Sequence, residues 1–213
     1  MAHTAILMIL NLASSMQKQI RMLVEGNHEN FHNHLMVDHV EINGKTLGVI
    51  GYGNIAREII KVAQALGMNI IVSTRTSRED TDSIHFTTRE EVLRQSDFIS
   101  LNCPLNESTH HMINKEALDM MKPTAYLINT ARGALIDENA LIDALQHSVI
   151  AGAGLDVQEK EPLDDASPLY TLDNVIITPH MGWRGLETRK RLISLIKDNI
   201  SAFSKGQPIN RVD

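Results

Sequence analysis

The sequence predicts an α/β fold, a doubly wound parallel sheet with a leading helix and a C-terminal helix. Short runs that are apolar throughout recur after residue 45, at residues 47–50, 70–72, 98–101, 125–128, 150–153 and 175–177. Helical patterns lie between most of these runs, at residues 55–66, 89–94, 115–120 and 138–147. Strands without polar positions are buried on both faces, which is typical of a parallel sheet covered by helices on each side. Right-handed crossovers then wind the sheet in two directions.

Each end of the chain is expected to form a helix. Apolar residues recur at steps of three and four through residues 2–25, at Ile6, Ile9, Leu10, Ala13, Met16, Ile20 and Leu23. Gly26 ends this helix, because glycine readily takes the backbone conformation that follows a helix. Since the helix is apolar on more than one side, it requires a partner surface. A last helix covers residues 186–205 and ends near Gly206.

Residues 27–43 are predicted to form a polar arm, which contains His28, His32, His34 and His39. Histidine is a common metal ligand, but no pattern of supporting groups accompanies this spacing. The simpler interpretation is a solvated arm, so the sequence predicts no metal site. The chain then divides into a helix and arm at residues 1–43, a central domain at 44–183 and the C-terminal helix at 184–213.

Composition argues against several classes of function. The formal net charge is −6 and the pI is about 5.9, whereas nonspecific nucleic-acid binding needs a basic surface. The single cysteine, Cys103, excludes an internal disulfide and is compatible with the cytosol. The apolar stretch at residues 5–10 is too short to span a bilayer and lacks the basic segment of a signal peptide. We therefore expect a cytoplasmic protein with no nucleic-acid partner and no membrane partner.

A glycine loop follows the first predicted strand and opens a predicted helix. It reads Gly51-Tyr52-Gly53-Asn54-Ile55-Ala56, the Gly-x-Gly-x-x-Ala pattern of a Rossmann-type dinucleotide-binding domain. Gly51 permits the tight turn, and Gly53 lets the backbone approach a pyrophosphate. The free N–H groups of Asn54 and Ile55 would face the phosphate oxygens. The alternative is a tight turn between strand and helix that binds no ligand.

The end of the second predicted strand bears on the choice between NAD and NADP. A carboxylate usually lies there to hold the ribose hydroxyls of NAD. In this chain the position is Thr74, which is followed directly by Arg75. A small hydroxyl beside a guanidinium suits the 2′-phosphate of NADP, because guanidinium forms paired hydrogen bonds with phosphate. We therefore expect NADP rather than NAD. The alternative is that Arg75 is a solvated residue that at most stacks on adenine.

Charged residues follow three later strands at the edge where this fold binds ligands. Arg132 lies in a tight turn, where it could bind a substrate carboxylate or polarise a 2-oxo group. Glu161 and His180 follow the next two strands, and a carboxylate that holds one imidazole nitrogen leaves the other as a proton donor. Asp156, at a strand end, could take the nicotinamide carboxamide. Each residue alone could instead be structural, but the set indicates hydride transfer to a 2-oxo acid.

These segments together resemble the D-isomer-specific 2-hydroxyacid dehydrogenases. The matching stretches are residues 44–55, 66–68, 97–105, 128–133, 154–163 and 178–182. The resemblance implies that Arg132 anchors the substrate, that Glu161 and His180 relay the proton, and that Asp156 contacts nicotinamide. It also implies that the turn at Cys103 and Pro104 lines the cofactor ribose. Thr130 and Gly182 lie in matching segments and are assigned to cofactor binding.

The resemblance carries further expectations and two departures. Trp183 and residues 187–189 look like the glycerate dehydrogenase, or hydroxypyruvate reductase, branch. Thr74 replaces the family's usual Asp, and the flavodoxin-like N-terminal domain that completes the substrate cleft is expected to be missing, whereas the C-terminus matches a normal family ending. The last helix would pack on the missing domain. In the family, the helix and arm equivalent to residues 2–40 clasp a partner, so a homodimer is expected.

The expected function is reduction of a small 2-oxo acid, of the hydroxypyruvate or glyoxylate class, or oxidation of the matching D-2-hydroxy acid. The alternative is a nucleotide-binding module or a corepressor-like scaffold of the same fold, with little turnover. The Arg132, Glu161 and His180 set favours the enzyme. The missing half of the cleft favours low activity for this polypeptide.

Overall fold

The computed structural model describes residues 1–211 and contains the predicted parallel sheet. Its seven strands lie in the order β3-β2-β1-β4-β5-β6-β7, and every neighbouring pair is parallel. Their bounds are β1 Thr46–Ile50, β2 Asn69–Ser73, β3 His85–Phe86, β4 Phe98–Leu101, β5 Tyr126–Asn129, β6 Gly152–Leu155 and β7 Val175–Ile177. The chain winds outward from β1 first toward β3 and then toward β7. The strand order therefore reverses beside β1, where such sheets bind ligands at their carboxyl edge.

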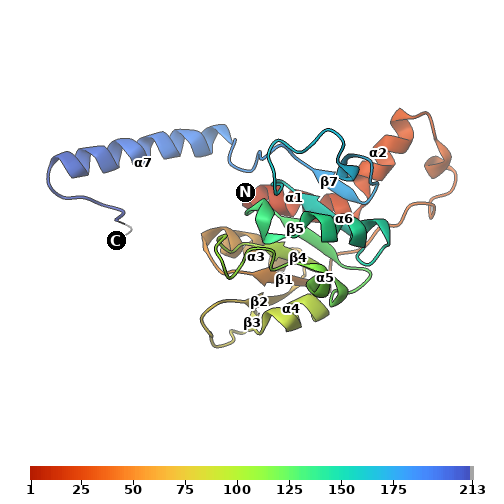
Figure 1. Cartoon of the computed structure of the whole chain (residues 1–213), viewed down its shortest axis with the longest axis horizontal. Helices are drawn as coiled ribbons and strands as arrows, with labels where there is room; N and C mark the ends of the chain where they lie inside the picture. The colour runs from red at the N-terminus through yellow and green to blue at the C-terminus, as the bar shows by residue number, and fades with distance from the viewer. Residues whose placement is uncertain (212–213) are drawn as a thin grey trace.

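Helices cover both faces of the sheet and enclose two hydrophobic cores (Figure 1). The helices α1, Ala2–Ala13, and α3, Asn54–Ala65, pack on one face. The other face is covered by α4, Arg89–Gln95, α5, Lys115–Asp119, and α6, Glu138–Gln146. Short 3-10 helices lie at Glu29–Phe31, Gly133–Leu135 and Pro168–Tyr170. The α/β fold class expected from the sequence is confirmed.

The predicted single helix at residues 2–25 is wrong, because the structure breaks it into two. Helix α1 ends at Ala13, and α2 covers Met16–Val24. Ser15 between them has a left-handed backbone, with φ of 49°, and its hydroxyl donates to the Asp38 carbonyl oxygen at 2.8 Å. Serine competes in this way for backbone partners, which favours a helix break over a continuous helix. The break lets α2 and the arm leave the domain (Figure 1).

Strand β6 begins later than the sequence predicts. Residues 150–153 were expected to form it, but β6 covers Gly152–Leu155. Ile150 lies before the strand but is fully buried in the hydrophobic core. An apolar residue is therefore required there even though it is not part of the sheet. A side chain at Gly152 would overlap the carbonyl oxygen of Asn174. Close approach of neighbouring backbone therefore explains a glycine inside this strand.

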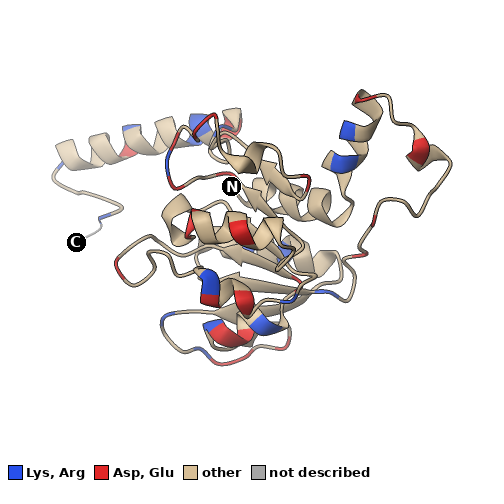
Figure 2. Cartoon of the chain, turned by 45° about the vertical axis from the view of Figure 1, so that its right-hand side comes forward, with Lys and Arg blue, Asp and Glu red and all other residues tan. Residues whose placement is uncertain are grey.

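Helix α7, Leu186–Ser204, projects from the domain and has no buried residue (Figure 1). Its apolar side chains are exposed: Leu186, Leu192, Ile193, Leu195, Ile196, Ile200 and Phe203. Acidic and basic residues are interspersed over the visible face of the molecule (Figure 2). Within residues 1–211, no helix combines the length and apolarity needed to cross a bilayer.

Candidate active site

Gly51 closes the turn between β1 and α3. Its φ is 95°, a conformation that L side chains rarely adopt. A Cβ at this position would lie 2.6 Å from the carbonyl oxygen of Asn102, at the end of β4. Two neighbouring strand ends therefore approach each other so closely that only glycine fits.

Gly53 is the residue that precedes the first turn of α3, and its surroundings differ from those of Gly51. A Cβ on Gly53 would have no atom of the described chain within 4 Å. Asn54 and Ile55 begin the helix, so their backbone N–H groups have no partner within it. Ala56 is fully buried under the sheet. Open space in front of a helix N-terminus is suited to a phosphate group.

A hollow of about 430 Å³ lies beside the glycine loop. It is lined by Met1, Ile55, Asn102, Cys103, Pro104, Leu105, Thr130, Ala131 and Arg132. Apart from Met1, which precedes α1, these residues follow β4 and β5 or lie at the start of α3. Burial raises the pKa of the Cys103 thiol, which makes it a poor nucleophile. Five of the residues assigned from the sequence therefore share one hollow: Ile55, Cys103, Pro104, Thr130 and Arg132.

The other side of the glycine loop is rich in guanidinium groups. Thr74 and Arg75 follow β2 and are partly or fully exposed, and the Thr74 hydroxyl donates to the Thr76 carbonyl oxygen at 2.5 Å. Tyr52, inside the glycine loop, has the guanidinium carbons of Arg57 and Arg78 at 5.1 and 5.4 Å from its ring centroid. Sequence reasoning missed both contacts, since Arg78 reaches Tyr52 only through the fold of the loop after β2.

Arg132 is held by a hydrogen-bonded turn at the end of β5. Asn129, which is fully buried, accepts from the Ala131 N–H at 3.0 Å and donates its side-chain amide to the Arg132 carbonyl oxygen at 2.8 Å. A side chain at Gly133 would overlap the backbone of Gln158. The turn that holds Arg132 is therefore packed directly against the loop that leads to Glu161.

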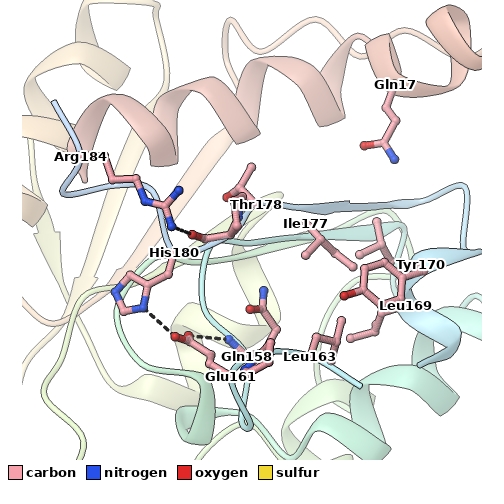
Figure 3. Close-up of a pocket in the computed structure, with 13 residues that line it drawn as sticks. Gln17, Gln158, Glu161, Leu163, Leu169, Tyr170, Ile177, Thr178, His180 and Arg184 are labelled. Carbon is pink, nitrogen blue, oxygen red and sulfur yellow. Dashed lines mark hydrogen bonds and ion pairs between the residues drawn. The ribbon is translucent and has the colours of Figure 1, made fainter. Parts of the chain in front are cut away.

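Glu161 and His180 form a hydrogen-bonded pair (Figure 3). Oε2 of Glu161 lies 2.8 Å from Nδ1 of His180, and its Oε1 accepts from the Gln158 N–H at 3.2 Å. The two side chains remain 37% and 40% exposed. His180 has a φ of 48°, a backbone conformation that is uncommon for histidine. With Nδ1 engaged by the carboxylate, Nε2 is the ring nitrogen that remains for another partner.

The pair opens on a second hollow, of about 540 Å³. Gln158, Leu163, Leu169, Tyr170, Ile177, Thr178 and Arg184 also line it, with Gln17 from α2 on its far side (Figure 3). Sequence reasoning missed Gln158 and Arg184. Arg184 donates to the Pro179 carbonyl oxygen at 2.5 Å and so supports the segment that carries His180. The structure places Arg132 in the first hollow and the Glu161–His180 pair in the second.

Asp156 has a structural function that the sequence did not indicate. It is 1% exposed, and its carboxylate accepts from the Thr178 hydroxyl at 2.6 Å and from the Met181 and Gly182 N–H groups at 2.8 Å each. Three donors thus hold the turn around His180 against the end of β6. Contact of Asp156 with nicotinamide stays a prediction.

Comparison with known proteins places the chain in a family. Residues 6–182 match the family profile described as D-isomer specific 2-hydroxyacid dehydrogenase, NAD binding domain. The glyoxylate reductase of Thermococcus litoralis is 44% identical over 176 residues, which cover 81% of this chain and 53% of that protein. The hydroxypyruvate reductase of Blautia hydrogenotrophica is 37% identical over 213 residues, with 98% and 66% covered. The chain thus spans about half to two thirds of the length of these curated relatives.

Solved structures agree with this assignment. The TT0316 protein of Thermus thermophilus superposes with a TM-score of 0.92 at 37% identity, over 100% of this chain and 67% of that chain. An acyclic imino acid reductase in complex with NADPH and D-Arg has a TM-score of 0.87 at 31% identity, with 98% and 66% covered. The D-lactate dehydrogenase of Aquifex aeolicus, in complex with NAD and lactic acid, has a TM-score of 0.83 at 33% identity, with 97% and 66% covered. The chain therefore belongs to the D-isomer-specific 2-hydroxyacid dehydrogenase family and contains its NAD-binding part.

Proposed function

We propose that the protein reduces a small 2-oxo acid to the D-2-hydroxy acid with a nicotinamide cofactor. The observation that carries this proposal is the hydrogen-bonded pair of Glu161 and His180. The pair lies at the carboxyl edge of the parallel sheet in the NAD-binding domain of the family. An imidazole held at Nδ1 by a carboxylate can present Nε2 to a substrate oxygen. The same arrangement runs in reverse when a hydroxy acid is oxidised.

The residues of the chain have separate parts in the proposed reaction. A nicotinamide cofactor held at the loop of Gly51 and Gly53 would supply a hydride for the carbonyl carbon of the substrate. His180 donates the proton from Nε2 to the oxo oxygen, so that the C=O bond becomes CH–OH. Glu161 stabilises the protonated imidazole before this transfer and keeps its ring in place. Arg132 binds the substrate carboxylate, for which its planar guanidinium is well suited.

The cofactor is held at the glycine loop, in keeping with the open space before Gly53. Relatives have been solved with NADPH and with NAD. We propose that this chain prefers NADP, because Arg75 takes the place after β2 that suits a phosphate. Arg75→Ala is expected to weaken NADPH binding by about 2 kcal/mol and to leave NADH binding nearly unchanged. Equal losses for both cofactors, measured by calorimetric titration, would show that Arg75 does not contact the 2′-phosphate.

The proposed substrate class is hydroxypyruvate or glyoxylate, the acids after which the similar reductases of Blautia hydrogenotrophica and Thermococcus litoralis are named. A turnover assay with both acids and both cofactors tests the proposal. The second candidate is a nucleotide-binding module with little turnover, for which the open space before Gly53 would suffice. Binding of NADPH without turnover, even after a substrate domain has been joined to the chain, would leave this second candidate.

We also propose a homodimer formed through residues 2–40. Leu7, Leu10, Met16, Ile20 and Val24 are exposed large apolar residues of α1 and α2. One residue expected at the interface has a different role: Ile9 is only 1% exposed because it packs inside the chain's own core. The cytosolic location expected from the single cysteine remains a prediction.

A further inference from the structure

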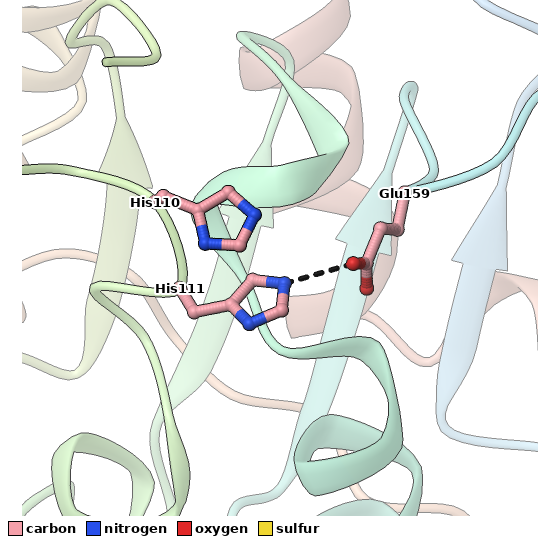
Figure 4. Close-up of side chains that lie close together, drawn as sticks. All are labelled: His110, His111 and Glu159. Atoms are coloured by element: carbon pink, nitrogen blue, oxygen red, sulfur yellow. Dashed lines mark hydrogen bonds and ion pairs between the residues drawn. The ribbon is translucent and has the colours of Figure 1, made fainter. Parts of the chain in front are cut away.

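Two histidines and a glutamate meet on the surface near the end of β6. His110 and His111 precede α5, and Glu159 follows β6, 48 residues later than His111. Nε2 of His111 lies 2.8 Å from Oε1 of Glu159. The His110 and His111 rings lie next to each other, and both face Glu159 (Figure 4). One nitrogen from each histidine and one carboxylate oxygen all lie within 4.8 Å of one another.

The backbone of His111 brings the two rings together. Neighbouring side chains in an extended chain point in opposite directions. His111 instead has a φ of 49°, and its N–H donates to the Ala134 carbonyl oxygen at 2.9 Å. The rings stack with centroids 3.9 Å apart and planes 27° apart. An uncommon backbone conformation at a histidine thus produces a pair of adjacent imidazoles.

We propose that His110, His111 and Glu159 bind a divalent transition-metal ion of the zinc class. Two imidazoles and one carboxylate are a known set of zinc ligands, which leaves a fourth position for water. Ligand atoms about 2.0–2.1 Å from such an ion lie about 3.4 Å from one another in a tetrahedron. Their ligand atoms already lie within 4.8 Å of one another, and the stacked rings would turn so that one nitrogen of each points at the ion. The sequence predicts no metal site, because only the fold brings these three residues together.

A second carboxylate supports the glutamate. The Glu159 N–H donates to Oε2 of Glu138 at 3.2 Å, and the Glu138 N–H approaches Oε2 of Glu159 at 3.5 Å. Oε1 of Glu159 is the oxygen directed at the imidazole. Hydrogen bonds to a ligating carboxylate fix its orientation and strengthen binding of the ion. The start of α6 therefore holds one ligand in place.

The ion would join two segments that are far apart in the sequence. One is the loop before α5, and the other is the loop from Asp156 to Glu161. Gln158, next to Glu159, packs against Gly133 and donates its N–H to Glu161. A bound ion would restrict this loop, so its expected function is to clamp the loop. The hydride-transfer residues themselves are not among its ligands.

Zinc chloride titrated into the full chain tests the proposal by calorimetry in a non-coordinating buffer near neutral pH. One ion per chain is expected to bind. His110→Ala and Glu159→Gln are each expected to raise the dissociation constant about tenfold or more. The matched control is the double variant His32→Ala and His34→Ala, because histidines of the arm could bind zinc independently. Binding should also weaken as the pH falls, because ligating imidazoles must be neutral.

Several outcomes would overturn the proposal: no binding of zinc, unchanged affinity in His110→Ala and Glu159→Gln, or an equal loss in the arm variant. Far-ultraviolet circular dichroism establishes that each variant is folded. A second measurement needs no variant. Amide NMR signals of the unaltered chain are expected to shift on zinc addition around His110, His111 and Glu159. Shifts confined to residues 27–43 would place the ion on the arm and contradict the proposal.

Discussion

Two glycines in one turn are expected to have different roles, Gly51 in the stability of the fold and Gly53 in binding of the cofactor. Gly51 has a left-handed backbone and lies against Asn102, whereas Gly53 has an ordinary φ of −83° and open space. Gly51→Ala is expected to lower the free energy of unfolding by about 1–3 kcal/mol. Gly53→Ala should change it by less than about 0.5 kcal/mol, yet weaken NADPH binding about tenfold, because the methyl group occupies the space of the pyrophosphate.

Urea unfolding and calorimetric titration of both glycine variants provide the measurements. Gly51→Ala serves as the stability control for Gly53→Ala. Full NADPH affinity in Gly53→Ala would show that the cofactor does not approach the backbone at this glycine.

His180→Gln tests the proposed proton donor. Glutamine keeps a polar side chain of similar reach but cannot donate a proton of suitable acidity. Turnover of hydroxypyruvate or glyoxylate should fall about 10²–10⁴-fold, with NADPH affinity nearly unchanged. The measurement is kcat in whichever polypeptide turns over, the chain itself or the chain joined to a substrate domain. A kcat within about twofold of the unaltered protein would place the donor elsewhere.

The sequence predicts residue types better than contacts. Arg132, Glu161 and His180 each follow a strand, so their shared edge could be expected from the order of strands alone. Gln158 could not be identified in this way, because its N–H meets Glu161 only through the shape of one loop. Arg78 reaches Tyr52 across a long loop for the same reason.

Asp97 connects three strands at the amino edge of the sheet. It precedes β4, accepts from the Thr46 N–H of β1 at 2.8 Å, and pairs with the Lys122 ammonium before β5 at 2.8 Å. Partial burial alone would raise the pKa of this carboxyl, but the hydrogen bonds from Lys122 and Thr46 outweigh it and hold the pKa below its ordinary value. Stabilisation from Asp97 is thus complete above about pH 3.9 and is lost as the pH falls through the lowered pKa.

Asp97→Asn is accordingly expected to lower the free energy of unfolding by about 1–3 kcal/mol near neutral pH. Its stability should also fall less steeply on acidification below about pH 4. Urea unfolding at several pH values gives both quantities. The matched control is Asp119→Asn, whose exposed pair with Lys115 should contribute less than about 1 kcal/mol. A similar loss in both variants would contradict the assigned function of Asp97.

At the scale of elements, hydrophobic periodicity predicts the buried strands but not the break between α1 and α2. The predicted bounds of β1 and β4 agree with the structure to within one residue, because a strand buried on both faces has an unbroken apolar run. The break at Ser15 could not be predicted from apolar spacing, which continues through it from Ala13 to Met16. The bond from Ser15 to Asp38 depends on how the arm returns to the domain.

At the scale of the whole molecule, exposed apolar side chains among residues 1–211 gather on α1 and α2 and on α7. Burial of apolar surface stabilises an interface by about 25 cal/mol per Å². A stable protein–protein interface usually buries about 1,200–2,000 Å² in total. The chain is expected to be a dimer at micromolar concentration, and Ile20→Asp should make it a monomer. Ile20 is 53% exposed on α2, so the substitution should leave the fold intact.

Light scattering with Ile20→Asp and Ile196→Asp distinguishes the two surfaces. Ile196 is exposed on α7. Should Ile196→Asp dissociate the dimer while Ile20→Asp does not, the interface would be α7 and not residues 2–40. A monomer mass for the unaltered chain would exclude both surfaces.

The position of α1 has a consequence for synthesis in the cell. This helix precedes all the strands in the sequence and packs against β5 and β6, and Met8 and Ile9 are buried in that core. At about 5–20 residues per second, the ribosome needs on the order of ten seconds to pass from Ala13 to Tyr126. Throughout that interval β5 and β6 are not yet present to cover α1, although α3, which also contacts α1, is made during this time. The side of α1 that packs on these strands therefore stays uncovered in the nascent chain, and the domain can close only after β6 has been translated.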